Sequence, residues 1–385
     1  MIHLHHGWVL AVLLIATFPL IYYLLATFAA LAFSRQARAQ SLPTFEPPVS
    51  ILKPVHGVDF ASYENYASFC TQDYPEYEIL FSVNEESDPA VAVVQRLIAD
   101  SPQRRISLFI GAEYLGANKK VNNLARLTRE AKHEVLALSD GDVRVGPKYL
   151  RNVVAPLQDR NVGAITSFYR GIAQHNLYAE LEALGASSDF FAGVLMAAWT
   201  EGVKFALGAS VVTTKTWMQK IGGFEAIASF LADDYEIGRR VTKSGGRVVL
   251  SHETVSTMYP AQTLRGFWQH QLRWARTVRL CRPASYAGLL FTQGLPWAIA
   301  AAFVAPSPWF AALYLFAYLV LRLAVAWSVG VLVVGDEVLR SRLWLVPLWD
   351  AIHFVVWAAS FASNHVVWGK VEYVVDRGRM KPVEP

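Results

Sequence analysis

Two aspartates separated by one glycine follow a short apolar run in the first half of the chain. Val135–Ser139 is too short for a helix and predicts a strand, and Asp140 and Asp142 come directly after it. Because side chains alternate along a strand, these two carboxylates should point the same way from its end. Such a pair suits a hard divalent cation that keeps open positions for phosphate oxygens. The alternative is an Asp-Gly turn that closes a hairpin.

Further acidic residues stand where helices are predicted to begin. Asp88 precedes Pro89, a combination typical of a helix start, so its carboxylate can cap that helix. The same carboxylate, at the edge of a sheet, could also contact a base or a ribose. Asp233 and Asp234 open a helix predicted to run to Lys243, where acidic residues complement the helix dipole. The functional alternative is that this acidic group deprotonates an acceptor hydroxyl.

Two basic segments accompany the carboxylates. Leu264–Arg279 mixes aromatic and basic residues, as a helix lying in a membrane interface does. Its Arg273, next to Trp274, could also neutralise a leaving diphosphate. Lys120 and Asn123 belong to the start of another predicted helix, which is either simply solvated or a phosphate and base contact at a helix N-terminus.

Alternating strands and helices are predicted to position these residues. The first strands are expected at 49–52, 77–83, 106–110 and 135–139, with helices from Pro89 and over 118–131 between them. This order predicts a parallel sheet that binds its ligands at the carboxyl edge. The second half is less regular, with strands expected at 162–167, 210–213 and 247–250 and an apolar helical stretch over 178–198.

The composition places part of the chain in lipid. Of its 385 residues, 54% are hydrophobic and 17% are charged, whereas soluble domains carry about 25% charged residues. Gly7–Phe33 contains no charged residue and is long enough to cross a bilayer core of about 30 Å, so it predicts a retained anchor. Arg35 and Arg38 follow it, which by the positive-inside rule places the next segment in the cytoplasm.

Three further apolar stretches, at 287–305, 309–334 and 343–368, precede a basic tail. Three crossings would put that tail outside, against the positive-inside rule. The first stretch contains Gln293, Gly294 and Pro296 and is the weakest span. A re-entrant or interfacial path there would return the tail to the cytoplasm, so the sequence leaves the number of spans open.

Charge and cysteine content exclude some classes. A net charge of +4 without a dense basic stripe argues against nucleic acid as a partner. Cys70 and Cys281 are far apart and lack the spacing of metal ligands, which indicates free thiols in a reducing compartment.

The order of these motifs resembles a known family, the membrane-bound inverting glycosyltransferases that use nucleotide sugars. Within that group the chain is most similar to ceramide glucosyltransferases and their bacterial hopanoid-associated relatives. The resemblance runs from about Val49 to about Pro283, through segments 51–59, 68–75, 87–90, 118–123, 139–145, 222–224, 232–235 and 270–274. It implies an α/β glycosyltransferase-A domain, nucleotide-sugar-binding and Rossmann-like, plus transmembrane α-helices.

The resemblance also implies a division of the chain and a location. The expected parts are an anchor (7–33), a cytoplasmic catalytic domain (34–260), a basic aromatic interfacial segment (261–286), membrane helices (287–368) and a tail (369–385). The expected location is a bacterial inner membrane, with the membrane and a membrane lipid acceptor as partners.

The roles of individual residues follow from the same resemblance. Nucleotide-sugar binding falls to Lys53, Asp88, Lys120, Asn123 and Asp140. Asp142, with Asp140, would hold a divalent metal, Mg or Mn, and Asp234 would be the catalytic base. Arg273 and His270 would cover the diphosphate and Trp274 would close the site. The family usually has Gln or Arg where this chain has His270, so charge at that position would depend on pH.

The expected function is inverting transfer of a sugar from UDP-GlcNAc or UDP-glucose to a hydroxyl of a membrane lipid, with a hopanoid polyol favoured as acceptor. A ceramide glucosyltransferase is the first alternative, and a polyprenyl-phosphate sugar transferase the second. A processive polysaccharide synthase would need more spans than this chain offers. A non-catalytic membrane scaffold is the alternative from a different class, and intact acidic residues at every motif argue against it.

Overall fold

The computed structural model describes residues 2–39, 43–369 and 371–383. They fall into two compact units, each treated separately below. The helical unit comprises Met1–Ala39, Ala173–Trp199 and Ala261–Val367, and the sheet unit comprises Gln40–Ile172, Thr200–Pro260 and Trp368–Pro385. Residues 40–42 and Lys370 of the predicted basic tail lie outside the described residues.

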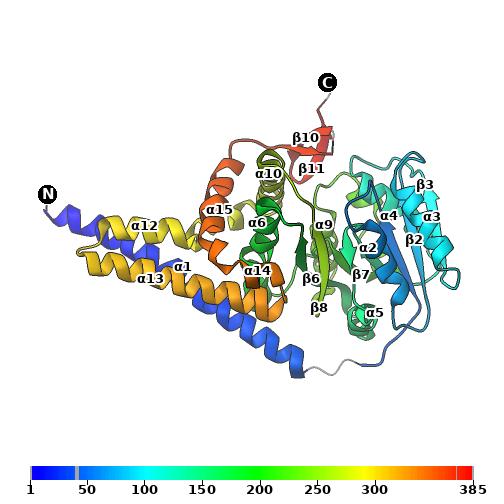
Figure 1. Cartoon of the computed structure of the whole chain (residues 1–385), viewed down its shortest axis with the longest axis horizontal. Coiled ribbons are helices and arrows are strands. Elements are labelled where there is room, and N and C mark those ends of the chain that lie inside the picture. The colour runs from blue at the N-terminus through cyan, green and yellow to red at the C-terminus, as the bar shows by residue number, and fades with distance from the viewer. Residues whose placement is uncertain (1, 40–42, 370, 384–385) are drawn as a thin grey trace. The chain divides into compact units, whose positions relative to one another are not determined.

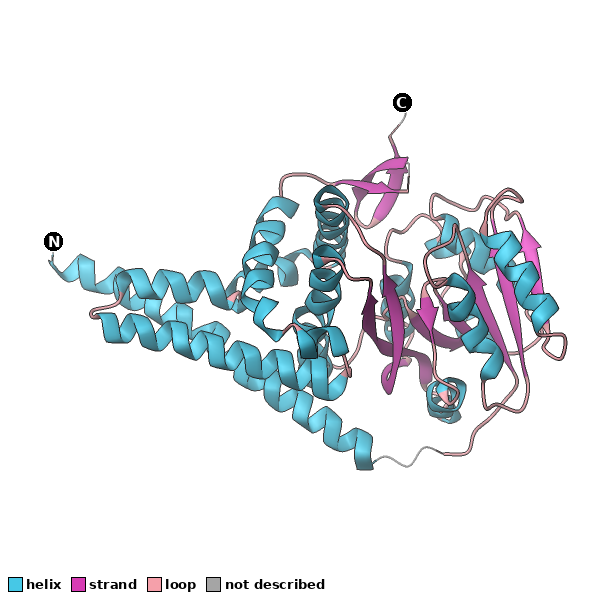
Figure 2. Ribbon diagram, viewed as in Figure 1, coloured by secondary structure: helices cyan, strands magenta, loops and turns pink. Residues whose placement is uncertain are grey.

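The described part of the sheet unit is built on an eight-stranded sheet in the order β3-β2-β1-β4-β7-β6-β8-β5 (Figures 1 and 2). Its strands are β1 (Val49–Pro54), β2 (Tyr77–Val83), β3 (Ile106–Ile110), β4 (Val135–Ser139), β5 (Val143–Arg144), β6 (Val162–Ala173), β7 (Ser210–Thr214) and β8 (Arg247–Tyr259). The pairs β2–β3, β1–β2 and β1–β4 are parallel, as the alternating strands and helices predict.

The other half of the sheet is antiparallel. β7 runs antiparallel to β4, so Ser210 at the start of β7 lies opposite Ser139 at the end of β4. β6 is antiparallel to β7, and β5 to β8. The carboxyl edge of the parallel strands therefore also receives the beginning of β7. The last strand, β8, is longer than the expected 247–250 because it continues to Tyr259.

The helices of the sheet unit cover the sheet and fix its edge. They are α2 (Ser62–Ser68), α3 (Ala90–Asp100), α4 (Lys119–Glu130), α5 (Tyr149–Val154), α8 (Lys215–Lys220) and α9 (Asp233–Lys243). One apolar core contains Leu124 of α4, Leu136 of β4 and Ile237 of α9. Burying each such side chain contributes about 1.5–3 kcal/mol, which holds the starts of α4 and α9 near the end of β4.

The C-terminal residues form strands rather than the expected tail. β9 (His365–Trp368), β10 (Val371–Asp376) and β11 (Arg379–Pro382) make a small three-stranded sheet. In the sheet unit, the N–H of Leu231 donates to the carbonyl of Gly378 (2.9 Å), and the N–H of Met380 donates to the carbonyl of Ser229 (2.7 Å). The β10–β11 hairpin is thus bonded to the segment directly before Asp233.

The helical unit contains the apolar segments of the chain. Its helices are α1 (Ile2–Ala39), α6 (Leu177–Gly185), a π-helix (Ala186–Phe190), α7 (Phe191–Glu201), α10 (Leu264–Cys281), α11 (Pro283–Gly288), α12 (Gly294–Val304), α13 (Pro308–Val325), a second π-helix (Ala326–Val333), α14 (Glu337–Ser341) and α15 (Val346–Ser360). α1 lies along α12 and α13 (Figure 1), where the Tyr23 hydroxyl accepts from the Gly294 N–H (3.1 Å) and the Tyr314 hydroxyl donates to the Leu13 carbonyl (3.1 Å).

Among the described residues, four helices are long and apolar enough to cross a membrane, and a bent pair could make a fifth. The four are Gly7–Ala39, Leu177–Glu201, Pro308–Val333 and Leu343–Ser360, and the pair is Pro283–Thr292 with Gly294–Val304, bent by 46°. Its break at Gln293 falls in the stretch predicted to be the weakest span. The last apolar stretch, expected over 343–368, is helical only as far as Ser360. Its final residues, 365–368, form strand β9.

One of these helices cannot cross a bilayer as a single span. Leu177–Glu201 connects β6 to β7, and both strands belong to the same sheet. A single crossing would place the two strands on opposite sides of the membrane. The structure groups 173–199 with the apolar helices, so the catalytic domain expected at 34–260 is interrupted by a segment of the helical unit.

Candidate active site

Three carboxylates from two segments of the sheet unit meet at the carboxyl edge of β4. Asp140 follows β4, while Asp233 and Asp234 form the first turn of α9. These three residues line one pocket together with Lys120 of α4 and Gly208 before β7, and its remaining lining is Pro54, Leu124, Leu138, Ser139, Val211 and Ile237. Residues more than ninety positions apart in the sequence are therefore brought together, as the sequence predicts for Asp140 and Asp234.

Gly208 lets two of these carboxylates approach each other. A Cβ atom at this glycine would lie 3.2 Å from Oδ2 of Asp234 and 3.6 Å from Oδ2 of Asp140. Both side chains are thus in contact with the same backbone position, and any larger residue would press on Asp234. The sequence analysis missed Gly208, whose signal is a small residue directly before the strand that pairs with β4.

Lys120 neutralises part of this negative charge. Its Nζ lies 2.6 Å from Oδ1 of Asp140 and 3.4 Å from Oδ2 of Asp233. Burial alone would lower the pKa of Lys120, but the carboxylates, Asp140 first among them, raise it well above its ordinary value. Lys120, which was predicted to contact a phosphate, is therefore positively charged at all ordinary pH values. It lies in the first turn of α4, beside the Asp140 carboxylate.

The two neighbouring aspartates of α9 have different surroundings. Asp233 is buried, paired with Lys120, and lies 3.5 Å from the amide nitrogen of Asn118. Asp234 is partly exposed and accepts a hydrogen bond from the N–H of Tyr235 (2.8 Å). Burial raises the pKa of Asp234 to about 7, and the charge of Asp233 adds to this effect. A carboxylate that titrates near neutral pH is suited to general-base catalysis.

Asp142 and Asp140 fit a divalent cation. Burial raises the pKa of Asp142 to about 7, and the neighbouring charge of Asp140 adds to the rise. A bound cation would favour the charged form of both carboxylates. Within the part of the chain that the structure describes, no group of three or more His, Cys, Asp or Glu residues gathers as a metal site. A cation such as Mg²⁺ often takes one or two carboxylates and completes its shell with water and substrate phosphates, which fits two aspartates.

Lys53 and Asn123 are buried and are not among the residues that line the pocket. Lys53 is fully buried, its Nζ donates to the carbonyl of Asp140 (2.8 Å), and it stands 3.9 Å from the centre of the Phe69 ring. Burial lowers the pKa of Lys53 to about 7. Asn123 is buried and accepts a hydrogen bond from the hydroxyl of Ser82 (2.8 Å). Both residues were predicted to bind the nucleotide sugar, and their contacts in the structure fix the strand ends that carry the aspartates.

Asp88 organises the loop after β1. Its carboxylate accepts from the N–H of Ala90 (2.9 Å), the first residue of α3, and from the N–H of Gly57 (2.9 Å). The Nδ1 atom of His56 lies 2.7 Å from its other oxygen. The predicted contact with the helix start is present, and binding of a base or ribose by this carboxylate stays a prediction.

His270, Arg273 and Trp274 belong to α10 in the helical unit. His270 forms an ion pair with Glu182 of α6, and Trp274 packs edge-on against Phe190 (ring centres 5.8 Å apart). Burial lowers the pKa of Arg273, and Glu182 opposes this shift. Glu182 is the second site residue not predicted from the sequence, since it lies in a helix with no motif around it.

The fold matches that of a solved structure. A solved structure, the mannosyltransferase PcManGT from Pyrobaculum calidifontis in complex with GDP-Man and Mn²⁺, is similar to this chain with a TM-score of 0.54 and 17% identity. The similarity covers 90% of this chain and 97% of that one. A parallel half-sheet joined to an antiparallel half, with acidic residues after β4, is the glycosyltransferase-A fold.

The family follows from the sequence. The model of glycosyl transferase family 21 matches residues 11–381, and the chain belongs to that family. Ceramide glucosyltransferase 1 of Caenorhabditis elegans is 26% identical over 231 residues, which are 60% of this chain and 49% of the relative. Ceramide glucosyltransferase of Komagataella phaffii is 32% identical over 117 residues, 28% of this chain and 23% of the relative. The chain thus spans half or less of the length of these curated relatives.

Proposed function

We propose that this protein transfers a sugar from a UDP-sugar to a hydroxyl of a neutral membrane lipid, with inversion at the anomeric carbon. The observation that carries the proposal is the contact of Asp140 and Asp234 with the same backbone position at Gly208, with Lys120 bonded to Asp140. This arrangement offers a charged surface for a nucleotide diphosphate beside a carboxylate that can take a proton.

In the proposed reaction, Asp234 takes the proton of the acceptor hydroxyl, and the hydroxyl oxygen attacks the anomeric carbon of the sugar. The bond between that carbon and the diphosphate breaks, and its electron pair leaves with UDP. A divalent cation, Mg or Mn, would be held by Asp142 with Asp140 and would supply charge stabilisation for the diphosphate. Lys120 adds a fixed positive charge beside Asp140. Asp88 would bind the nucleoside, Arg273 and His270 would cover the diphosphate, and Trp274 would exclude water.

The comparisons support one acceptor over another. The curated relatives are ceramide glucosyltransferases, which supports glucose as the sugar and a ceramide-like lipid as the acceptor. A hopanoid polyol with N-acetylglucosamine, favoured by the sequence motifs, finds no support there and is the second candidate. The neighbour solved with GDP-Man and Mn²⁺ supports a nucleotide sugar and a divalent cation as donor and cofactor. The proposed location is a cell membrane, with the sheet unit on the cytoplasmic side.

The test is a transfer assay with purified full-length protein in phosphatidylcholine nanodiscs. UDP-glucose and UDP-GlcNAc are each supplied with ceramide, bacteriohopanetetrol or a polyprenyl phosphate, and the products are identified by mass. Transfer to ceramide supports the first candidate, and transfer to the hopanoid polyol supports the second. Transfer only to the polyprenyl phosphate, or to none of the three lipids, overturns the proposal.

A further inference from the structure

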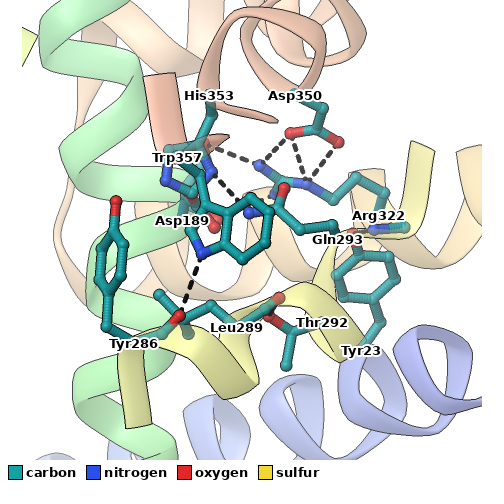
Figure 3. A network of polar contacts seen from close by, with 12 residues as sticks. Tyr23, Asp189, Tyr286, Leu289, Thr292, Gln293, Arg322, Asp350, His353 and Trp357 are labelled. Atoms are coloured by element: carbon teal, nitrogen blue, oxygen red, sulfur yellow. Dashed lines mark hydrogen bonds and ion pairs between the residues drawn. The ribbon is translucent and has the colours of Figure 1, made fainter. Parts of the chain in front are cut away.

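A cluster of polar side chains lies among the apolar helices of the helical unit, away from any motif of the sequence analysis (Figure 3). Asp189 comes from the π-helix Ala186–Phe190, His353 from α15, and Gln293 from the break between the two bent helices. The Nδ1 atom of His353 lies 2.9 Å from Oδ2 of Asp189 and 3.5 Å from Nε2 of Gln293. Single π-turns within α-helices occur frequently at functional sites.

A neighbouring ion pair in the same unit, between Arg322 and Asp350, is a structural contact. Arg322 of α13 and Asp350 of α15 expose 3% and 9% of their side chains and are joined at 2.8 Å. Arg322 also donates to the carbonyl of Ser188 (2.9 Å), and the Tyr318 hydroxyl donates to Asp350 (2.8 Å). This pair is buried and extensively hydrogen-bonded, so its function is to hold the helices together.

The pair of Asp189 and His353 differs because it is accessible. His353 exposes 25% of its side chain and Asp189 exposes 32%. The imidazole is nevertheless held in place, since the Trp349 ring stacks on it (centres 5.9 Å apart, planes 9° apart). Trp349 in turn packs on the backbone of α6, where a Cβ at Gly185 would overlap its ring. A preorganised and accessible ionisable pair in an apolar helical unit is a candidate for binding.

The functional groups of this cluster indicate which kind of ligand it can bind. Asp189 offers a carboxylate acceptor, His353 an imidazole, and Gln293 an amide that both donates and accepts. Hydroxyl and amide groups match this set, whereas a phosphate would be repelled by the carboxylate. Trp357 lies one turn after His353 on α15 and donates to the carbonyl of Tyr286 (3.0 Å), adding aromatic surface on the same face (Figure 3).

The geometry points to Asp189, His353 and Gln293 as the site that binds the hydroxyl and amide groups of the acceptor lipid in this glycosyltransferase. The inference rests on the proposed function, because it takes a neutral lipid to be the acceptor. It also separates the acceptor candidates by charge, since a lipid phosphate would meet Asp189.

The experiment measures lipid binding without donor. Full-length protein in phosphatidylcholine nanodiscs is photolabelled with a ceramide that carries a diazirine in its acyl chain, in competition with unlabelled ceramide or a polyprenyl phosphate. Asp189→Asn and His353→Gln remove the charge or the imidazole, and each should weaken labelling about tenfold, as expected for loss of a hydrogen bond to a charged group. His175→Gln, at an exposed histidine of the same unit, is the matched control and should label like the wild type.

Kinetic readouts separate this inference from the proposed function. Acceptor KM should rise about tenfold in both variants, while the KM for the UDP-sugar and UDP release without acceptor stay unchanged. If either variant fails to elute as a monodisperse species, Gln293→Leu tests the same site. Variants that label like the wild type, or a wild type labelled by neither the ceramide nor a diazirine-bearing hopanoid polyol, overturn the inference. Lipid binding that depends on Asp189 without sugar transfer to any lipid would overturn the proposed function alone.

Discussion

Two adjacent aspartates at the start of α9 show how the environment of a residue assigns its role. Asp233 is paired with Lys120, and the amide of Asn118 is within 3.5 Å, so its charge is already compensated inside the protein. Asp234 faces Gly208 and Asp140, and burial raises its pKa to about 7. The first turn of α9 thus supplies one carboxylate that pairs with Lys120 and a second one that is the proposed base.

Substituting each aspartate by asparagine should separate these two roles. Asp234→Asn keeps the shape but removes the proton acceptor, and we expect turnover to fall about 10²–10⁴-fold with UDP-sugar affinity near that of the wild type. Asp233→Asn leaves Lys120 with one partner fewer and should chiefly weaken UDP-sugar binding. Turnover and donor affinity, measured by initial rates and calorimetry, provide the comparison. An equal fall of affinity and turnover in Asp234→Asn would make that residue structural.

Because the Asp234 and Asp140 carboxylates lie close to Gly208, the addition of a single methyl group at this residue should lower activity. In Gly208→Ala the new Cβ would lie 3.2 Å from Oδ2 of Asp234, so the carboxylate must shift by a few tenths of an ångström. Small misplacements of reacting groups are costly, and we expect kcat to fall roughly 10–100-fold with an unchanged melting temperature. Gly193→Ala, at a glycine with open space around its Cβ position, is the control. Full activity of Gly208→Ala would remove Gly208 from the site.

Removal of the divalent cation should act through the aspartates after β4. Because Asp140 and Asp142 are the proposed ligands, turnover should be lost in excess EDTA and return with Mg²⁺ or Mn²⁺. Asp142→Asn should weaken both metal and UDP-sugar binding. Glu113→Gln, at an exposed glutamate bonded to Arg129, is the control. Wild-type turnover that persists in EDTA would contradict a catalytic metal.

The sequence predicted the aspartates of the site but not everything that surrounds them. Asp140 and Asp234 carry recognisable motifs, since a strand end and a helix start have local signatures. Gly208 and Glu182 have none. Gly208 reaches the pocket because β7 pairs antiparallel with β4, and strand direction depends on tertiary contacts rather than on local pattern. Glu182 faces His270 across eighty-eight positions of chain, a distance that no periodicity encodes.

At the scale of elements, the C-terminal hairpin supports the segment directly before the proposed base. β10 and β11 are bonded to Ser229 and Leu231, and the guanidinium of Arg379 lies 5.2 Å from the centre of the Phe230 ring. On its other side this segment is bonded to α4, because Asn118 donates from its side chain to the carbonyl of Phe230 (2.9 Å). The segment is therefore held between two elements directly before α9 begins.

Loss of the hairpin should disturb catalysis more than donor binding. A chain that ends at Trp368 lacks the bonds to Ser229 and Leu231, which frees the start of α9 and the carboxylate of Asp234. We expect kcat to fall at least tenfold, while the KM for the UDP-sugar changes less than threefold. A chain that ends at Val383 retains both strands and is the control. Equal activity of the two truncations would show that the hairpin does not position the base.

Some helices and strands are predictable from the local sequence pattern, and others form only through contacts with distant parts of the chain. The parallel strands β1 to β4 are short apolar runs separated by amphipathic helices, which the sequence reveals directly. The sequence predicts membrane helices as far as 368 and a tail over 369–385, because residues 371–382 mix charged and apolar side chains. These strands pair with each other, bury the apolar side chains of Tyr373, Val375 and Met380, and are bonded through the backbone to Ser229 and Leu231. Such contacts join distant parts of the chain, and no local pattern shows them.

At the scale of the whole chain, the strands that belong to the sheet unit restrict how the helices can cross a membrane. β8 ends at Tyr259 and β10 begins at Val371, and both belong to the sheet unit. The chain between them must therefore cross the membrane an even number of times. α12 and α13 lie side by side and are joined by the short turn 305–307 (Figure 1). α12 taken together with the bent segment Pro283–Thr292, and α13, therefore suit a pair of crossings. α15, which carries Asp350 and His353, is then the segment that stays at the interface.

Accessibility of single cysteines should test this arrangement. In a background with Cys70→Ala and Cys281→Ala, we introduce Tyr114→Cys on the sheet unit, Lys381→Cys on β11 and Ser307→Cys in the turn between α12 and α13. The positive charges of Arg35 and Arg38 predict a cytoplasmic sheet unit, and in that case a membrane-impermeant thiol reagent should label only Ser307→Cys in intact cells. All three should react after the cells are opened, which controls for buried thiols. Labelling of Lys381→Cys but not Tyr114→Cys from outside would separate the hairpin from the sheet unit, and an odd number of crossings would follow.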